Sequence, residues 1–158
     1  MQIFLSHSSA DSDLVAQVKA AVRSLAAVYC TEDDVQAGIN VHSKIQAQIR
    51  KSDLMIVLLS HNGAASPYLH QEIGFAKSAG KLIIPVVSTD VSARSLGMLE
   101  GIEYIQLDDD VDWLTRLSIR VEAVVRTSEA KAKADKATTD LVLSVVVLAA
   151  VLLAARQL

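Results

Sequence analysis

The sequence predicts an α/β domain in which an open, five-stranded parallel sheet carries helices on both faces. Short apolar runs alternate along the chain with segments of helical period, and residues typical of helix starts lie between them. The runs are apolar throughout, as in strands that are buried on both faces. Parallel strands need right-handed crossovers, so the expected architecture is a flavodoxin-like layer.

Each expected element follows from its own local pattern. The five strands are expected at residues 3–5, 27–30, 54–59, 82–87 and 104–107. The helices are expected to begin at Asp11, Val41, Ser66 and Asp110. Functional groups in such a sheet belong at the carboxyl ends of the strands. Three loops are therefore candidates for a site, at residues 6–11, 31–40 and 60–66.

Composition limits the classes of partner. The chain has 158 residues and a net charge of -3, and it has no basic run that would contact a phosphate backbone. Nucleic acid is therefore not an expected partner. The single cysteine, Cys30, cannot form an internal disulfide, and the first residues do not read as a signal peptide. These features predict a domain in the reducing cytoplasm.

The chain is expected to divide into a domain at residues 1–126, a helical Ala/Lys-rich linker at 127–140 and a hydrophobic tail at 141–158. Residues 141–155 are almost entirely apolar and would form a C-terminal hydrophobic helix of about 22 Å, against roughly 30 Å for a bilayer core. We expect a single-pass membrane anchor, with a packing or oligomerisation helix as the alternative. Three lysines precede the tail, which places the domain on the cytoplasmic side.

Glu72 is the most informative single residue. At about 100° per residue it falls on the apolar arc of its helix, together with Tyr68, Leu69, Ile73, Phe75 and Ala76. A carboxylate that is half withdrawn from water is costly unless something there needs it. Two interpretations stay open at this point. Glu72 is either a functional acid or an edge residue that caps a backbone N–H or pairs with a lysine.

Several common chemistries lack their residues. Neither a phosphate-binding Gly-x-x-x-x-Gly-Lys-Ser/Thr loop, nor a Gly-x-Gly-x-x-Gly fingerprint, nor a Gly-x-Ser-x-Gly elbow occurs. Ser6 and Ser60 stand where a phosphorylated receiver domain would need acids. His42, His61 and His70 lack clustered partners, so they are expected to be solvated and not metal ligands. The acidic run 108–110 is expected to favour the start of the next helix.

Four segments in order carry a family resemblance. They are residues 3–11, residues 34–38, residues 45–60, and Ser66-Pro67-Tyr68 followed by Glu72. Together they resemble a TIR domain of the bacterial type, over residues 1–125. The resemblance implies that the loop 33–40, which contains Gly38, serves self-association and covers a nucleotide site. It also implies that Glu72 is catalytic, as the matching glutamate is in members that cleave NAD.

The implied reaction has a simple chemical requirement. Breaking the nicotinamide–ribose bond places positive charge on the ribose, and a nearby carboxylate stabilises that charge. Tyr68 stands where the family commonly has Trp and would form an aromatic wall. Ser6, His7 and Ser8 would contact the diphosphate or adenine side, although this loop lacks the basic residues of many NAD-cleaving relatives. NAD is then a substrate, and neither a cofactor nor a metal is expected.

The expected function is that of a membrane-tethered NAD glycohydrolase or cyclase that signals in defence or cell death and associates with itself or other TIR domains. The alternative is a non-enzymatic TIR–TIR interaction module that acts as a scaffold, with Glu72 merely structural.

Overall fold

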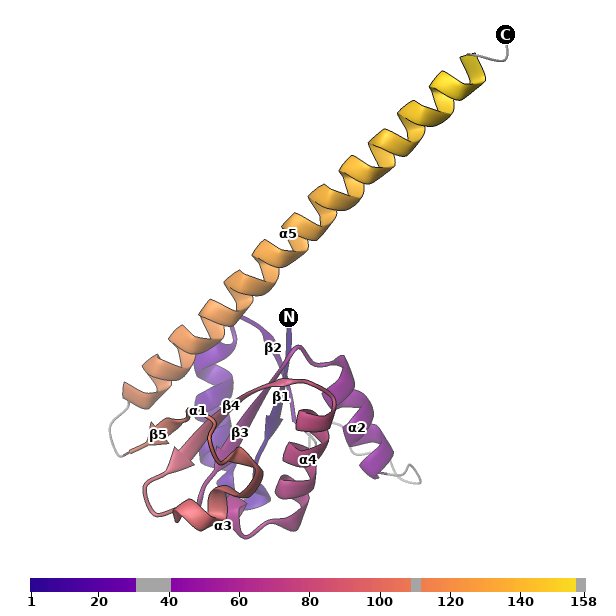
Figure 1. The fold of residues 1–158 in the computed structure, drawn as a ribbon. Coiled ribbons are helices and arrows are strands. Elements are labelled where there is room, and N and C mark those ends of the chain that lie inside the picture. Colours follow the sequence, from indigo (N-terminus) through magenta and orange to yellow (C-terminus); the bar gives the residue numbers. More distant parts are fainter. Residues whose placement is uncertain (31–40, 109–111, 156–158) are drawn as a thin grey trace. The chain divides into compact units, whose positions relative to one another are not determined.

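The five-stranded parallel sheet predicted from the sequence is present. The computed structural model describes residues 1–30, 41–108 and 112–155, with side chains up to residue 143 (Figure 1). The strands are β1 (Gln2–Ser6), β2 (Ala27–Tyr29), β3 (Leu54–Leu59), β4 (Leu82–Ser88) and β5 (Ile105–Leu107). They pair in the order β2-β1-β3-β4-β5, all parallel. The flavodoxin-like expectation is therefore met at the level of the sheet.

The strand order reverses direction between β1 and β3. The chain leaves β1 for β2 on one side and then returns to place β3 on the other side, with Ile3 opposite Leu54 and Ser6 opposite Val57. In open parallel sheets, ligands bind outside the carboxyl ends of the strands at such a reversal. The ends of β1 and β3 are therefore the place where the fold itself positions a site.

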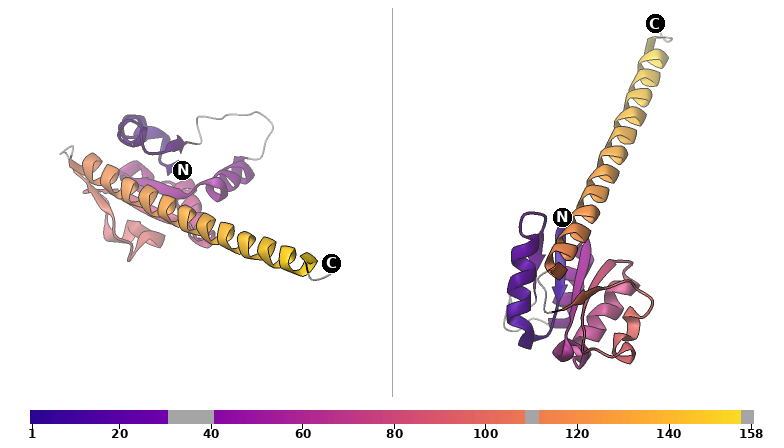
Figure 2. Two further views of the ribbon diagram at one scale, coloured as in Figure 1. Left: turned by 90° about the horizontal axis from the view of Figure 1, so that it is seen from above. Right: turned by 90° about the vertical axis from the view of Figure 1, so that its left-hand side faces the viewer.

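Helices cover both faces of the sheet (Figure 2). On one face Phe4, Met55 and Val57 pack with Ile49 of α2 (Val41–Lys51) and Ile73 of α4 (Pro67–Ser78). Successive strand residues point to opposite faces, so Ile3 and Leu5 point away from this cluster. On that second side lie α1 (Ser12–Val22) and the first turns of α5 (Asp112–Ala155), with buried residues Val15, Val18, Val22, Leu117 and Val121.

Two short helical elements were not expected. The segment after β3 contains α3 (His61–Ala64), whose N-cap Ser60 accepts a hydrogen bond from Gly63 N, and the segment after β4 contains the 3-10 turns η3 (Ala93–Leu99). Neither is long enough to show an apolar period, so the sequence pattern read both as loops. Another 3-10 turn, η1 (Ser9–Asp11), precedes α1, which begins at Ser12 rather than Asp11. The expected cap Asp110 lies outside the described residues.

The start of α4 follows its sequence signal. Ser66 is the N-cap, its Oγ accepts a hydrogen bond from Leu69 N at 3.3 Å, and Pro67 occupies the first helical position. The helix then buries Leu69, Ile73 and Ala76 against the sheet. This packing fixes the rotation of α4, and hence the direction in which Glu72 points.

The predicted membrane anchor is wrong. Within the described residues, no helix has both the length and the apolar content that a membrane span needs. The reason is the distribution of charge along α5, a single helix of 44 residues that has charged residues as far as Asp140. The apolar sequence after Asp140 would extend only about 22 Å as a helix, which is less than the roughly 30 Å of a bilayer core. The expected separate C-terminal hydrophobic helix is not seen either, and the predicted membrane localisation has no support.

Contacts divide the chain into two units, Met1–Val121 and Glu122–Leu158. The first unit holds the whole sheet, its helices and the first turns of α5. The second consists of the remainder of α5, in which Leu141, Val142 and Leu143 are exposed. The candidate site described below belongs entirely to the first unit.

Candidate functional site

A serine hydroxyl from β1 and a glutamate carboxylate from α4 meet near the strand-order reversal. Ser6 is the last residue of β1 and is buried, and Glu72 lies partly buried one and a half turns into α4. The Ser6 Oγ donates a hydrogen bond to Glu72 Oε2 at 2.5 Å. This bond explains how an acid is tolerated among apolar neighbours, because a carboxylate withdrawn from water needs polar partners. It also orients the carboxylate.

Glu72 lies in the wall of a pocket of about 700 Å³, within the range of small-molecule sites. The pocket is lined by Leu5, His7, Ser8, Ser9, Val41, His42, Ile45, Ser66, Tyr68 and Glu72. The β1–η1 segment and the cap of α4 supply hydroxyl groups, and α2 supplies apolar surface. Glu72 is the only acid among these lining residues, and none of them is a lysine or an arginine.

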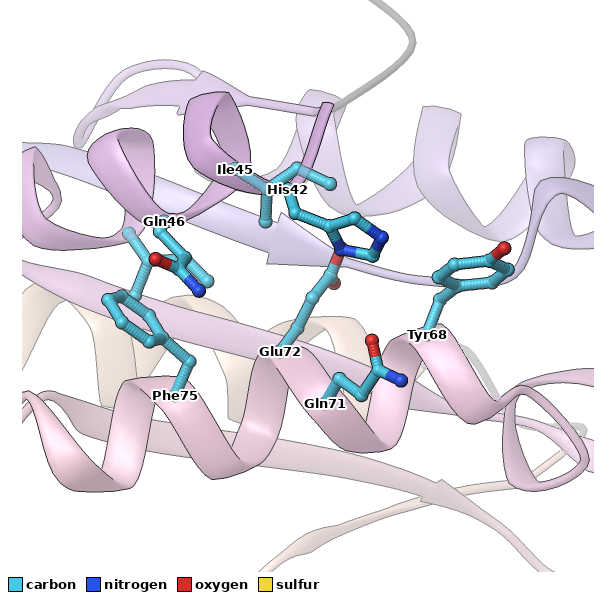
Figure 3. A pocket seen from close by; sticks show the side chains of 8 residues that line it. His42, Ile45, Gln46, Tyr68, Gln71, Glu72 and Phe75 are labelled. Carbon is cyan, nitrogen blue, oxygen red and sulfur yellow. The ribbon is translucent and has the colours of Figure 1, made fainter. Parts of the chain in front are cut away.

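His42 and Tyr68 form an aromatic pair beside the carboxylate (Figure 3). Their ring centroids are 5.9 Å apart with an interplanar angle of 30°. The Tyr68 residue is 65% exposed, so it lines the pocket rather than the apolar core. His42 was expected to be solvated and without a role. It is exposed, but it also lines the pocket.

No local sequence signal could have identified His42. It lies in the first turn of α2, and its proximity to Tyr68 depends on how α2 packs against α4. Ile45, three residues later, shares a helix face with His42, but this spacing does not say what that face meets. Ile45 packs against the core and lines the same pocket.

The structure gathers most of the site residues expected from the sequence. His7, Ser8, Tyr68 and Glu72 line one pocket, and Ser6 contacts Glu72 directly. His7 Nδ1 lies 2.9 Å from its neighbour's carbonyl, Ser8 O, so part of its hydrogen-bonding capacity serves its own loop. Gly38 lies outside the described residues. The catalytic and binding roles of these residues stay predictions.

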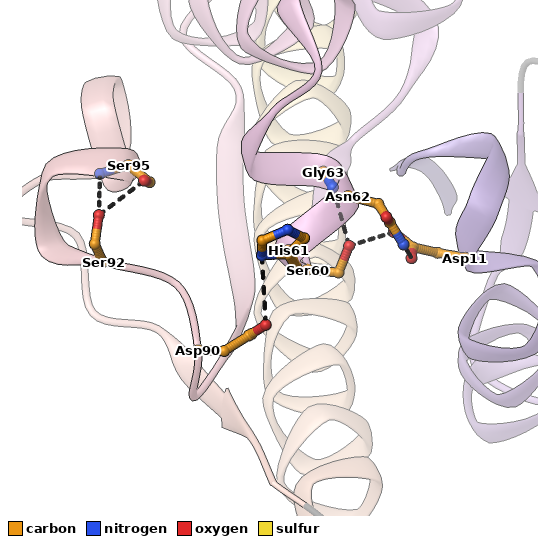
Figure 4. A network of polar contacts seen from close by, with 8 residues as sticks. All are labelled: Asp11, Ser60, His61, Asn62, Gly63, Asp90, Ser92 and Ser95. Carbon is orange, nitrogen blue, oxygen red and sulfur yellow. Dashed lines mark hydrogen bonds and ion pairs between the residues drawn. The ribbon is translucent and has the colours of Figure 1, made fainter.

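A second polar network lies between the end of β3 and η1, the turn whose first residue, Ser9, lines the pocket (Figure 4). Asp11 and Ser60 are both buried, and Ser60 Oγ donates to Asp11 Oδ2 at 2.6 Å. Asn62 Nδ2 donates to the other oxygen, Asp11 Oδ1, at 3.1 Å. Ser60 Oγ also accepts from Gly63 N at 3.0 Å. The network connects the segment after β1 to the segment after β3. From the sequence pattern, Asp11 was predicted only to start a helix.

The remaining histidines have local partners. His61 Nδ1 lies 3.7 Å from Asp90 Oδ2 with both side chains well exposed, and His70 Nε2 lies 3.0 Å from Ala64 O. Among the residues that the structure describes, no three His, Cys, Asp or Glu side chains group as a metal site. The described lining of the pocket offers a carboxylate, hydroxyl groups and aromatic rings to a ligand.

These features define a class of protein: a flavodoxin-like α/β domain with a carboxylate in a small-molecule pocket at the strand-order reversal. The family follows from a direct match. Residues 3–118 match the family model described as TIR domain, and the chain therefore belongs to the TIR domain family. This match does not distinguish the bacterial type, which stays a prediction.

Two solved structures share the fold. A CMP N-glycosidase from Clostridium botulinum, BcmB, is 20% identical with a TM-score of 0.56, and the alignment covers 75% of this chain and 99% of that one. The TIR domain of the Toll-related receptor TRR-2 from Hydra magnipapillata is 18% identical with a TM-score of 0.62, covering 75% and 96%. At these identities the likeness shows the fold alone. A search among curated proteins finds no match.

Proposed function

We propose that this TIR domain cleaves the N-glycosidic bond between the base and the ribose of a nucleotide, and that NAD is its substrate. One observation carries the proposal: a partly buried carboxylate, Glu72, is held by the Ser6 hydroxyl in the wall of a pocket of about 700 Å³. Glu72 lies near the strand-order reversal, which is where ligands bind in open parallel sheets.

The reaction asks little of the protein beyond that acid. As the bond between nicotinamide and ribose breaks, the electron pair leaves with nicotinamide, which departs as a neutral base, and positive charge develops on the ribose. A carboxylate facing the ribose stabilises this charge and accepts hydrogen bonds from its hydroxyls. Water then adds to the ribose carbon and loses a proton, giving ADP-ribose, or a nucleophile within the substrate closes a ring.

The other lining residues fit supporting roles. Tyr68 and His42 offer ring faces to a flat group, and Ser8, Ser9 and Ser66 offer hydroxyl groups to a sugar. Because the described residues that line the pocket include no lysine or arginine, phosphate groups would depend there on hydroxyl, imidazole and main-chain donors. We therefore expect weaker binding of the diphosphate than a basic site would give.

The similar structures widen the choice of substrate without deciding it. One neighbour in fold is, by its printed description, a CMP N-glycosidase, and the bond it cleaves belongs to the same chemical class. This supports testing CMP beside NAD. The family resemblance also predicts a role in defence or cell-death signalling. In our proposal, the domain signals by depleting or converting such a nucleotide.

The decisive experiment incubates the purified full chain at high concentration with NAD, and separately with CMP, and measures released nicotinamide or cytosine by chromatography. Glu72→Gln keeps the size of the side chain but removes its charge, so we expect at least a hundredfold loss of base release. Glu129→Gln, in an exposed position on α5, is the matched control and should behave as the parent. Undiminished release by Glu72→Gln would dispose of the catalytic assignment.

The same hydrogen bond also supports a second candidate function. The Ser6–Glu72 contact joins β1 to α4, which is what a purely structural glutamate would do in a TIR–TIR interaction module. In that case the parent chain releases no base at any concentration but forms assemblies that sedimentation detects. The segment 33–40, expected to mediate association, lies outside the described residues, so self-association through it stays a prediction.

A further inference from the structure

A second, smaller pocket lies between α2 and α4, and Glu72 also lines it (Figure 3). Its volume is about 60 Å³, and Ile45, Ile49 and Phe75 give it apolar walls. That volume has room for roughly four to six water-sized spheres, since each needs about 10–15 Å³. A closed cavity that binds benzene has a volume of about 150 Å³, so this pocket admits part of one ring and not a dinucleotide.

The two pockets share one wall. Glu72, His42, Tyr68 and Ile45 line both of them. Among the described residues, serine side chains line the larger pocket alone, whereas mainly apolar side chains and amides line the smaller one. A ligand that contacts Glu72 can therefore meet hydroxyl groups in the larger pocket and mainly apolar side chains and amides in the smaller one.

Two side-chain amides border the smaller pocket. Gln46 comes from α2 and Gln71 from α4, and Figure 3 shows them on either side of Glu72. Within the described part of the chain, neither amide makes a hydrogen bond to protein. Each amide offers both a donor and an acceptor, which is the pattern that the edge of an amide-bearing ring requires.

An N-glycoside has the same two-part character. A flat base of low polarity is joined at one bond to a hydroxylated ribose, and the carboxylate must face the ribose carbon at that bond. We propose that the smaller pocket is the subsite for the leaving base, which is a single six-membered ring bearing an amide or exocyclic amine, and that Gln46 and Gln71 select it. The ribose then lies in the larger pocket, with the scissile bond over Glu72. This assignment rests on the proposed function.

The test measures base binding separately from catalysis. Ligand-observed saturation-transfer NMR on the full chain gives dissociation constants for free nicotinamide, cytosine and adenine. Gln46→Met and Gln71→Met keep side-chain length and helix propensity but remove the amide, so each should weaken nicotinamide or cytosine binding about fivefold. Gln17→Met, at an exposed position on α1, should change nothing. Adenine, with two fused rings, should bind more weakly than the one-ring bases.

The outcomes separate the subsite from the function. Parent-like binding of both one-ring bases by both Met variants would overturn the subsite even if NAD cleavage is normal. Adenine that binds as tightly as nicotinamide and loses affinity in the Met variants would overturn the one-ring assignment. If the parent cleaves neither NAD nor CMP, the proposed function fails, whatever affinities are measured for the free bases. In an active enzyme, each Met variant should also raise the nicotinamide concentration needed for product inhibition about fivefold.

Discussion

The Ser6 hydroxyl and the Glu72 carboxylate are joined by a 2.5 Å hydrogen bond across 66 positions of sequence. The donor is the last residue of β1, and the acceptor is carried by α4, which contacts β4 and shares a core cluster with β3. One contact thus connects the strand end where the fold places ligands to the acid proposed to act on them. It fixes Glu72 Oε2 while the pocket remains open beside it.

Removing the hydroxyl of Ser6 should impair the orientation of Glu72 without removing its charge. For Ser6→Ala we expect base release to fall about tenfold in kcat, the kinetic equivalent of one hydrogen bond to a charged group, with KM little changed. The free energy of unfolding should fall by about 1 kcal/mol. Kinetics and urea denaturation measure the two effects. Ser78→Ala, at an exposed serine, is the control, and an unchanged kcat in Ser6→Ala would show that the contact is only structural.

Tyr68 should matter for binding and hardly at all for stability. Because the residue is 65% exposed, Tyr68→Ala should change the free energy of unfolding by no more than about 0.5 kcal/mol. Loss of the ring face should weaken substrate about tenfold, whereas Tyr68→Phe keeps the ring and should stay close to the parent. Steady-state kinetics and thermal melts measure this. Tyr104→Ala, at another exposed tyrosine, serves as control, and a large drop in melting temperature for Tyr68→Ala would contradict the pocket position.

Asp11 should contribute to stability through its buried network. In Asp11→Ala, the Ser60 hydroxyl and the Asn62 amide both lose their acceptor, and Ser60 stays buried. We expect a loss of about 2 kcal/mol in the free energy of unfolding, measured with urea. Asp13→Ala, at an exposed acid in the first turn of α1, should cost less than about 1 kcal/mol. Equal costs in the two variants would mean that the network contributes nothing beyond a surface charge.

Two helical glycines should respond oppositely to alanine. A Cβ on Gly63 would lie 2.7 Å from Leu58 O, which belongs to the backbone of β3, so Gly63→Ala should destabilise the domain by about 1–3 kcal/mol. On Gly74 it would meet Met98 Sδ at 3.1 Å, and this flexible side chain can move. Gly74→Ala should therefore be neutral or stabilising by up to about 1 kcal/mol. Calorimetric melts of the pair check the order, and a Gly63→Ala variant as stable as the parent would refute the steric argument.

What the sequence determined is local. A short window of sequence displays the periods of 2 and 3.6 residues and the capping residues. These were enough to predict the apolar run of β3, the Ser66-Pro67 start of α4 and the acid on the apolar face of that helix. The carboxyl-end rule then pointed to the edge of the sheet where the larger pocket lies. The tail shows the limit of a local pattern, because its hydropathy suggested an anchor although its length falls short of a bilayer.

What only the tertiary structure decided is which side chains from different elements meet. Ser6 beside Glu72, His42 beside Tyr68 and Asp11 beside Ser60 each join residues at least 26 positions apart. A period states which face of a helix is buried, but not how that helix is rotated and shifted against its neighbour. Those two quantities are set by the packing of α2 and α4 on the sheet, so a contact between two helices is fixed only when the whole core is formed.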